Sequence, residues 1–412
     1  MKASTTVTDE SWPPTIDIEA LGLDQGGLLL VRRALLEVAP GTELRVRGRA
    51  QAWTLHLATW CRQQGHAVRF DERPDGSCDA WVQRTANAEG RWRNAVNTGH
   101  ALLDVGEMPG AMAEAEWGLA ARGAYVEAGG PRFDFALSRR DELWASTAGA
   151  LYLQGAAAQW DPERSIDWNA SFTLAPVIES AVVQVMSYLI ENENAALLVP
   201  ARHLGQIHPH YREVMQLLAL QCADEARHVE VFTRRATLRG EALTLSMAGG
   251  QASLRTLFEA ADFSQAAFLL SVLGEGTFVN LLNFLHEHAP DPVTRQITRL
   301  AARDEARHVA FGMAHLEHRL AAQPDYRDNL RNAIEQRHDA LAATSGLNEE
   351  VFDALVLIAA GGLEPVAVAR GHDAVQSLRR DMATGRKARL ARLGFAADDA
   401  ERLAELHTRN FM

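Results

Sequence analysis

Cysteine is scarce in this chain. The 412 residues include three, Cys61, Cys78 and Cys222, and no two of them form a CxxC pair. A thiolate metal site needs cysteines clustered at short spacing, and disulfide frameworks belong to oxidising compartments. The scarcity therefore excludes a thiolate metal site and fits a protein of the reducing cytoplasm.

Targeting segments and patterns for binding nucleic acid are also missing. The first residues, MKASTTVTDESWPP, contain no apolar segment of the kind found in a signal peptide. No block of basic residues occurs and the formal net charge is -12, so nucleic acid is not an expected partner. The most apolar stretch, residues 263–286, contains Glu275, Asn280 and Asn283, which favours a buried core helix over a membrane span.

The composition is that of a packed globular protein, with 47% hydrophobic and 23% charged residues, and the length suggests two or three domains. Residues 1–13 are expected to be a disordered tail. Residues 14–86 predict a small α+β module in the order strand, helix, strand, helix, strand, from TIDIEAL to DAWVQRT. Residues 87–137 are rich in glycine and alanine, and we expect a connector with one short helix near 110–122.

From about Ser138 onward the hydrophobic pattern is helical, so the expected fold class is mainly α, preceded by the small α+β module. Residues 138–345 predict a helical bundle, and residues 346–412 predict additional C-terminal helices. The last helical patterns of the chain cover 327–345, 349–360, 364–384 and 397–409. Prolines fall at the expected breaks between helices, at Pro162, Pro209, Pro290, Pro292 and Pro324.

One internal repeat dominates the helical region. The sequence DEARHV occurs at 224–229 and again at 304–309, and upstream of it ENENAALL from Glu191 aligns with EGTFVNLL from Glu275. Two helix pairs are thereby related: 174–201 with 212–236, and 264–288 with 293–320. A duplicated helical hairpin is a natural way to build a four-helix bundle.

Each copy of the repeat carries a Glu-x-x-His pair. Residues three apart lie on one face of a helix, so each pair can direct a carboxylate and an imidazole to one point. The aligned partner helices add one glutamate each. The predicted metal ligands and catalytic residues are therefore Glu191, Glu225, His228, Glu275, Glu305 and His308. Carboxylates with two imidazoles suit iron or manganese, and carboxylates can bridge two ions.

Glu275 is the only charged residue between Phe263 and Leu285. A lone buried glutamate is usually neutralised by a proton or an arginine, and leaving one unpaired costs several kcal/mol. The duplicated Glu-x-x-His pairs favour a metal instead. Gly274 and Gly276 flank Glu275, although each glycine lowers helix stability by about 1 kcal/mol relative to alanine. They indicate close helix packing, open volume beside the metals, or a local helix distortion.

Two other glutamates compete with Glu191. Glu193 lies about 200° around the helix from Glu191, so both cannot point inward, and the repeat alignment favours Glu191. Glu179 is three turns away and is predicted to be structural. A further cluster, His203, His208 and His210, has no carboxylate partner at helical spacing. These three are predicted to be surface histidines and not a second metal site.

Around the repeated motifs, the chain resembles the ferritin-like superfamily of diiron carboxylate proteins. CADEARHVEVF at 222–232 and ARDEARHVAFG at 302–312 are similar to motifs of its oxygenase and ribonucleotide-reductase branch, and the resemblance covers roughly residues 140–320. It implies two iron ions, or manganese with iron, and O2 as co-substrate. It also implies that Asp224 hydrogen-bonds His308 and that Asp304 hydrogen-bonds His228.

Three positions depart from particular members of that branch. Phe232 stands where the radical-generating small subunit of ribonucleotide reductase commonly has a tyrosine. Val279 stands where multicomponent hydrocarbon monooxygenases commonly have a threonine, and Ala301 where aminoarene N-oxygenases have an additional histidine ligand. These departures leave the particular reaction open.

Residues 14–86 resemble the small TusA-like sulfurtransferase fold. The matching stretches are LGLDQGG at 21–27, ALLEVAPGTELRV at 34–46 and WCRQQGHAVRF at 60–70. Members of that family carry a Cys-Pro at the start of the first helix, and this chain does not. Cys61 lies on the second helix and does not replace it. We therefore expect no sulfur transfer, and expect the module to pack on the bundle, bind a partner or help form a substrate entrance.

The sequence thus predicts a non-haem diiron oxygenase that uses O2 to oxidise a small organic substrate by hydroxylation or N-oxygenation. Two alternatives stay open: a ferroxidase or iron-handling protein, and a binding protein with a vestigial metal site. The expected partners are a small-molecule substrate, an external electron donor and, as an open option, a second copy of the chain. Neither nucleic acid nor a membrane is expected.

Overall fold

The computed structural model describes residues 13–73, 77–85, 94–104, 106–342 and 349–406. The chain divides into two compact units. The first runs up to Thr98 and also contains Tyr125–Pro131, and the second contains Gly99–Ala124 and everything from Arg132 onward. The predicted disordered tail, residues 1–13, lies outside the described residues except for Pro13.

The first unit is a four-stranded sheet with two helices. Strand β1 (Thr15–Asp17) pairs parallel with β2 (Glu43–Gly48), and β4 (Cys78–Gln83) pairs antiparallel with both β2 and β3 (Ala67–Glu72). Helix α1 (Gly27–Glu37) connects the parallel pair, and α2 (Trp53–Gln64) follows β2. Leu44 and Val46 of β2 alternate inward and pack with Leu57 and Cys61 of α2, as a half-buried strand requires.

The predicted order of elements in this unit is observed, but strand β3 was missed. Its sequence, AVRFDE, lies at the edge of the sheet and is largely exposed, so it lacks the apolar alternation by which a strand is recognised. The prediction of a helix near residues 110–122 was wrong. Glycines and Pro109 interrupt that segment, and one 3₁₀ turn, η3 (Ala115–Trp117), is its only helical element.

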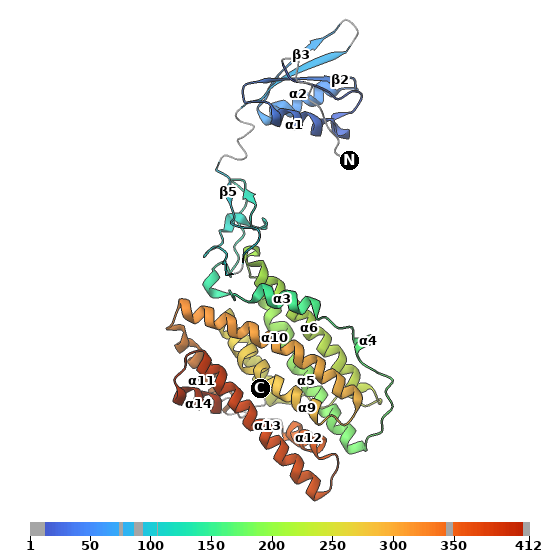
Figure 1. Ribbon diagram of the computed structural model, residues 1–412, viewed down its shortest axis with the longest axis vertical. Helices are drawn as coiled ribbons and strands as arrows, with labels where there is room; N and C mark the ends of the chain where they lie inside the picture. The colour runs from blue at the N-terminus through green and yellow to red at the C-terminus, as the bar shows by residue number, and fades with distance from the viewer. Residues whose placement is uncertain (1–12, 74–76, 86–93, 105, 343–348, 407–412) are drawn as a thin grey trace. The chain divides into compact units, whose positions relative to one another are not determined.

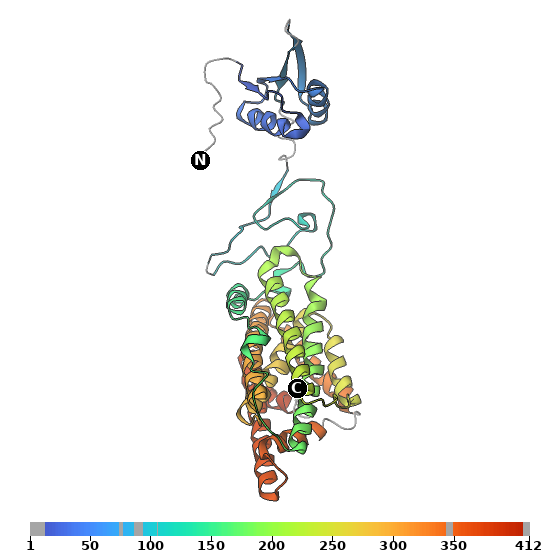
Figure 2. The ribbon, with the colours of Figure 1, turned by 90° about the vertical axis from the view of Figure 1, so that its right-hand side faces the viewer.

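Four long helical segments form the centre of the second unit (Figures 1 and 2). They are α5 (Pro176–Leu204), α6 (Arg212–Thr237), the composite run α8–η6–α9 (Phe263–Glu287) and α10 (Pro292–Ala322). Helix α5 packs on α6, and α9 packs on α10, so the two predicted hairpins are confirmed. Pro176 and Pro292 occupy first-turn positions, and the side chain of Asp291 caps α10 through the N–H of Thr294.

The composite run contains a change of helix type. It consists of α8 (Phe263–Ala267), the π-helical segment η6 (Phe268–Glu275) and α9 (Gly276–Glu287). This Phe263–Glu287 run is the one straight helical run in the described residues long and apolar enough to cross a membrane, and 78% of its most apolar window is buried in the unit. Most of its apolar surface is therefore buried in the bundle core.

Further helices cover the bundle. Helix α3 (Ala148–Ala157) packs on α6, α12 (Glu349–Ala360) on α5, and α13 (Pro365–Arg392) on α9. Helix α11 (Tyr326–Ala342) contacts α7 (Ala248–Phe258) and α14 (Ala397–Leu406). The C-terminal helices predicted from the sequence are present, and they share one compact unit with the bundle. The short α4 (Pro162–Ser165) precedes α5.

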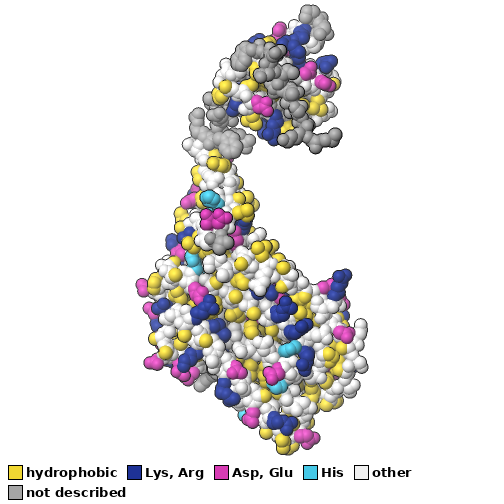
Figure 3. Space-filling view, viewed as in Figure 1, with side chains coloured by type: hydrophobic (Ala, Val, Ile, Leu, Met, Phe, Trp, Pro, Cys, Tyr) yellow, Lys and Arg dark blue, Asp and Glu magenta, His cyan; other side chains and the backbone are white. Residues whose placement is uncertain are grey.

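The surface of the second unit is mixed in charge. On the face drawn in Figure 3, acidic and basic side chains are interspersed over the bundle helices. This face therefore has no extended basic surface of the kind that binds a polyanion.

Candidate metal centre

Four carboxylates and two imidazoles meet in the core of the bundle. Each of the four central segments contributes, with the side chains of Glu193, Glu225, His228, Glu275, Glu305 and His308. None of the six is more than 4% exposed. Such a concentration of ionisable groups in an apolar core is costly unless the groups are paired or bound to metal.

The six side chains divide into two groups that could each hold a metal ion. One group consists of Glu193, Glu225, His228 and Glu305, and the other of Glu225, Glu275, Glu305 and His308. Within each group the candidate ligand atoms all lie within 4.8 Å of one another. Glu225 and Glu305 belong to both groups, as expected for carboxylates that bridge two ions.

The bridging geometry is visible in the distances to the imidazoles. Glu225 places Oε2 3.1 Å from Nδ1 of His228 and Oε1 3.0 Å from Nδ1 of His308. Glu305 places its oxygens 3.3 Å and 3.4 Å from the same two nitrogens. Each glutamate thus directs one oxygen to each imidazole.

Glu191, the predicted ligand on α5, is not part of this cluster. The structure places Glu193 there instead, with Oε1 3.5 Å from Nδ1 of His228 and the side chain 1% exposed. Glu191 is only partly buried and lies on the opposite side of the helix. The alignment of the two hairpins gave the wrong register. It placed Glu191 34 residues before Glu225, although the residue that enters the cluster, Glu193, lies 32 residues before Glu225. Glu275 lies 30 residues before Glu305, and the turn between α5 and α6 contains the extra 3₁₀ turn η5 (Pro209–Tyr211), so the two hairpins differ in length. The other five predicted residues are brought together.

The second nitrogen of each imidazole faces an aspartate from the opposite motif. Nε2 of His228 lies 3.2 Å from Oδ2 of Asp304, and Nε2 of His308 lies 3.4 Å from Oδ2 of Asp224. This is the crossed pairing that the family resemblance implied. It directs Nδ1 of both histidines toward the carboxylates and fixes the ring orientation.

Side chains that the sequence analysis did not single out hold the two aspartates. Arg307 ion-pairs with Asp224 and Asp304, and Arg227 ion-pairs with the same two carboxylates. Trp160 Nε1 donates to Oδ2 of Asp304 at 2.7 Å. The two arginines are the fourth residues of the repeated DEARHV motifs, so the repeat itself contained this signal.

Burial and mutual charge shift the protonation of the cluster. Burial raises the pKa of Glu193 and of Glu275 well above the usual carboxyl value. Burial opposes ionisation of Glu225 as well, but His308 and His228 hold its pKa below the usual range. Burial disfavours the charged form of both histidines, yet the facing carboxylates raise the pKa of each well above its ordinary value. The metal-free cluster therefore retains protons at neutral pH.

Metal loading should release protons. Ligands bind metal in their deprotonated forms, so two divalent ions must displace the protons held on Glu193, Glu275, His228 and His308. We expect about two to four protons released per chain at pH 7, and a metal affinity that rises with pH as those raised pKa values are passed. Calorimetric titration with Mn²⁺ in two buffers of different ionisation enthalpy measures this number. A binding enthalpy that does not depend on the buffer, together with a metal affinity that does not depend on pH, would contradict this expectation.

A further observation indicates that this ligand set suits a pair of metal ions. Several buried cluster atoms make no well-aligned hydrogen bond, although imidazole nitrogens lie near some of them: Oε1 of Glu193, Oε1 of Glu225, Oε2 of Glu275, both oxygens of Glu305 and Nδ1 of His308. An unsatisfied buried polar atom costs about 1–3 kcal/mol. Hard cations with oxygen and imidazole ligands would satisfy these atoms together.

Glu275 ends the π-helical segment, so the local helix distortion is present. Its Oε1 accepts a hydrogen bond from Nε2 of Gln221 at 2.9 Å. The two flanking glycines have different roles. A Cβ on Gly276 would lie 2.5 Å from the guanidinium carbon of Arg389, so Gly276 allows close packing, whereas Gly274 lines a cavity beside the cluster. Arg389 in turn donates from Nε to the carbonyl of Val272 in the π segment at 2.7 Å.

The cavity beside the cluster is small and mostly apolar. It is lined by Asn192, Glu193, Ala196, Leu254, Leu257, Leu269, Leu270, Gly274, Glu275, Phe278, Glu305 and Arg337. Its free volume is about 20 Å³, which is room for about one water molecule. The carboxylates form one side of this space, and leucines from α7 and η6 form much of the remainder.

The three histidines between α5 and α6 are not on the surface. His203, His208 and His210 are buried, against the prediction, in contact with aromatic side chains. Burial lowers the pKa of each, and it lowers that of His210 to about 4. Their aromatic neighbours come from distant parts of the chain, which loop spacing does not reveal. The metal-ligand groups found among the described residues do not include them.

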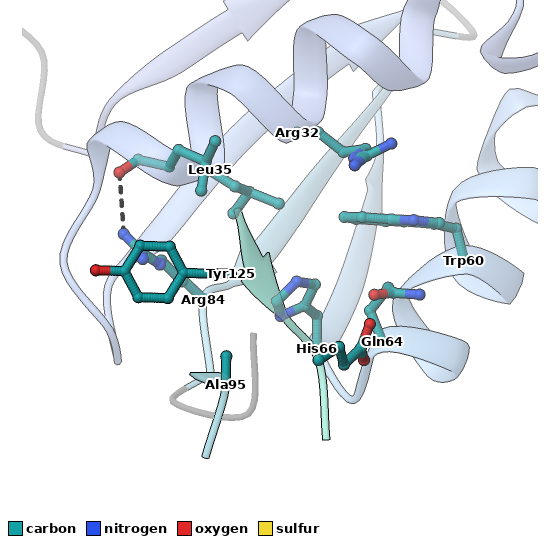
Figure 4. Close-up of a pocket in the computed structure, with 10 residues that line it drawn as sticks. Arg32, Leu35, Trp60, Gln64, His66, Arg84, Ala95 and Tyr125 are labelled. Atoms are coloured by element: carbon teal, nitrogen blue, oxygen red, sulfur yellow. Dashed lines mark hydrogen bonds between the residues drawn. The ribbon is translucent and has the colours of Figure 1, made fainter. Parts of the chain in front are cut away.

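The first unit has a pocket of its own, shown in Figure 4. Its volume is about 400 Å³, and Arg32, Trp60 and His66 are among the residues around it. Cys61 does not face this pocket: it is fully buried in the core, and burial raises the pKa of its thiol to about 12. A buried, protonated thiol is a poor nucleophile, in keeping with the expected absence of sulfur transfer. The TusA-like resemblance of the unit stays a prediction.

Comparison with known proteins gives matches among solved structures. No protein-family model matches the chain, and no curated protein matches it at a significant level. A mutant R2-like ligand-binding oxidase with an aerobically reconstituted Mn/Fe cofactor is 18% identical over 60% of this chain and 92% of that chain, with a TM-score of 0.48.

Two further matches come from named organisms. The R2-like ligand-binding oxidase from Sulfolobus acidocaldarius is 16% identical over 58% of this chain and 90% of that chain, with a TM-score of 0.39. A protein with aldehyde deformylating oxidase activity from Synechococcus is 16% identical over 56% and 96%, also with a TM-score of 0.39. By its own helices and the residues gathered in its core, the second unit of this chain is a ferritin-like four-helix bundle with the ligand set of a carboxylate-bridged two-metal site.

Proposed function

We propose that the protein is an oxidoreductase that uses O2 at a pair of iron ions, or manganese with iron, to oxidise a small organic substrate. The observation that carries the proposal is the pair of four-residue ligand groups sharing Glu225 and Glu305. When bound, two redox-active ions in such a site supply the electrons for O2 activation. An external electron donor and a cytoplasmic location belong to the same proposal.

The chain's own residues have defined tasks in this reaction. Glu225 and Glu305, which belong to both ligand groups, would hold both ions, and His228 and His308 are oriented by the aspartates opposite them. Glu275 sits between the π segment and the cavity, where the irregular helix permits its carboxylate to shift. The leucines around the cavity exclude bulk water from the reacting side of the cluster.

Iron oxidation without an organic substrate is the second candidate. The small free volume of the cavity favours it, because an organic molecule enters only if the lining side chains move apart. The apolar lining favours the oxygenase, because a path for hydrated iron ions would be polar. The two candidates predict different products from the same site.

The experiment is anaerobic iron loading followed by addition of O2. We expect close to two iron ions per chain by elemental analysis and rapid O2 consumption. The Glu305→Ala variant should lose both, because Glu305 serves both ligand groups. Glu317→Ala, a change on the same helix in a partly exposed ion pair with Arg392, should keep both. Less than one iron per wild-type chain contradicts the proposal. Growth of a ferric mineral with excess ferrous iron identifies a ferroxidase.

A further inference from the structure

One carbonyl of the π-helical segment is left without a main-chain donor. The N–H of Gly276 donates to the carbonyl of Ser271, five residues back, and helix α9, in which each N–H donates four residues back, begins at Gly276. Where the bonding changes from five residues back to four, one carbonyl is passed over. That carbonyl belongs to Val272, whose side chain is fully buried, so an unsatisfied oxygen there would be costly.

A side chain from another helix supplies the missing donor. Nε of Arg389 on α13 donates to the carbonyl of Val272 at 2.7 Å, and α13 contacts both the π segment and α9. Burial lowers the pKa of Arg389 to about 10, so its guanidinium remains a cation at neutral pH. Among the described residues no carboxylate lies within ion-pair distance of this cation. The contact is therefore a charge-assisted hydrogen bond from a cation to the π segment itself.

Glycine at position 276 makes room for this contact. A Cβ there would lie 2.5 Å from the guanidinium carbon of Arg389 and 2.6 Å from its Nε, closer than side-chain atoms approach one another. Glycine within a helical run lowers its stability, so alanine would be the better residue if the space were free. Gly276 thus keeps open the position that the guanidinium occupies, directly after Glu275.

The π segment determines the direction in which Glu275 points. A π turn contains one residue more than an α turn allows, and each residue of an α-helix advances about 100° around the axis. If the run were α-helical throughout, the residues on one side of the change would rotate by that angle relative to those on the other. With α8 held by its packing on α10, the carboxylate of Glu275 would turn away from Glu225, Glu305 and His308.

We infer that Arg389 is a positioning residue for the metal pair: it donates to the carbonyl of Val272 through the space left by Gly276, fixes the π segment and thereby directs Glu275 to one metal ion. The hydrogen bond is made to the main chain, so the side chain of Glu275 stays free to shift. Glu275 belongs to one ligand group and not to the group that contains Glu193, so the effect should fall on one metal position. This inference rests on the metal pair of the proposed function and is independent of the substrate.

The test measures Mn²⁺ binding to the metal-depleted, full-length protein by calorimetric titration. The wild-type chain should bind two ions. Arg389→Met should bind one of them about ten- to hundredfold more weakly, which is the usual loss when a partner that orients a ligand is removed. Arg389→Lys keeps a charged donor and should restore part of that affinity.

Electron paramagnetic resonance of the same samples gives a second readout. Two Mn²⁺ ions bridged by common carboxylates produce a magnetically coupled spectrum, whereas a single bound ion produces the spectrum of isolated Mn²⁺. At a Mn²⁺ concentration that fills both positions of the wild-type protein, Arg389→Met should show the isolated spectrum. A purely structural role of Arg389 would lower stability without this selective loss of one ion.

Two further variants complete the design. Arg386→Met is the matched control, because Arg386 also lies on α13 and has its pKa lowered by burial to about 10, but donates to the hydroxyl of Thr277 and not to the carbonyl of Val272. It should bind both ions as the wild type does. Gly276→Ala forces the guanidinium away and should reproduce the effect of Arg389→Met, although alanine favours the helix. It tests the inference even where the arginine variant does not fold.

Two results would overturn the inference. One is wild-type affinity for both ions in folded Arg389→Met or Gly276→Ala. The other is an equal weakening in Arg386→Met, which would show a general effect of removing a buried cation from α13. In both cases a wild-type chain that binds two ions leaves the proposed function standing. If the wild-type chain binds fewer than two Mn²⁺ ions, the proposed function fails and the inference fails with it.

Discussion

Replacing Glu193 with alanine should reduce iron-dependent O2 consumption to background, whereas the same change at Glu191, two residues away, should leave it near the wild-type rate. Glu193 is 1% exposed and faces His228 within one of the two ligand groups. Its loss leaves that group with two bridging carboxylates and one imidazole. Removal of a direct ligand costs more than the ten- to hundredfold in metal affinity that is typical of an outer partner.

The measurement pairs elemental analysis of anaerobically loaded protein with an oxygen electrode. Glu193→Ala is expected to retain about one iron ion per chain or fewer, because only the group without Glu193 stays complete. Glu191→Ala is the matched control, with the same side chain removed from the same helix. If Glu191→Ala lost its metals and Glu193→Ala kept them, the position of α5 in the bundle would be wrong by more than half a turn.

The second large effect should be on stability. Arg235 is fully buried and joins three helix ends: it ion-pairs with Glu179 of α5 at 2.6 Å and with Asp291 at the start of α10 at 2.8 Å, and its Nε donates to Thr294. Arg235→Met leaves two buried carboxylates without a cation. Breaking a buried pair in this way costs about 3–5 kcal/mol.

Urea denaturation followed by far-ultraviolet circular dichroism measures this change. Arg234→Met, one residue earlier, removes a more exposed pair with Glu163 and should cost about 0–1 kcal/mol. Equal midpoints for the two variants would show that the buried network adds no stability. The same network explains Glu179, which was predicted to be structural and is held by Arg235.

The sequence was sufficient to predict the bundle because its signals are local and repeated. Apolar periodicity, prolines at helix starts and the two DEARHV copies predicted the long helices and five of the six cluster residues. The register of α5 could not be obtained from the repeat, because the two hairpins have turns of different length. A local signal was present, however. The residues one and two helical turns before and after Glu193 lie on the same face of the helix, and they are apolar. They are Met186, Leu189, Ile190, Ala196, Leu197 and Pro200.

Other features depend on contacts between distant segments. The burial of His208 and His210 comes from Trp117 and Phe135, which lie far away in the sequence. The π-helical segment leaves no mark in a pattern of apolar residues, and only the glycines beside Glu275 indicated a distortion. The place of Arg337 at the wall of the cavity is likewise invisible in the sequence, since the pattern of α11 does not indicate which of its arginines lies there.

The sharing of Glu225 and Glu305 gives the site a pseudo-twofold symmetry, with one copy of the repeat on each side. That symmetry is broken at Glu275, which alone ends a π-helical segment and accepts a hydrogen bond from Gln221. The two metal positions are therefore chemically unequal, and they communicate through common ligands. Occupation of one position would hold two ligands of the other in place, so loading should be cooperative. A mixed pair of metals should bind in one preferred order.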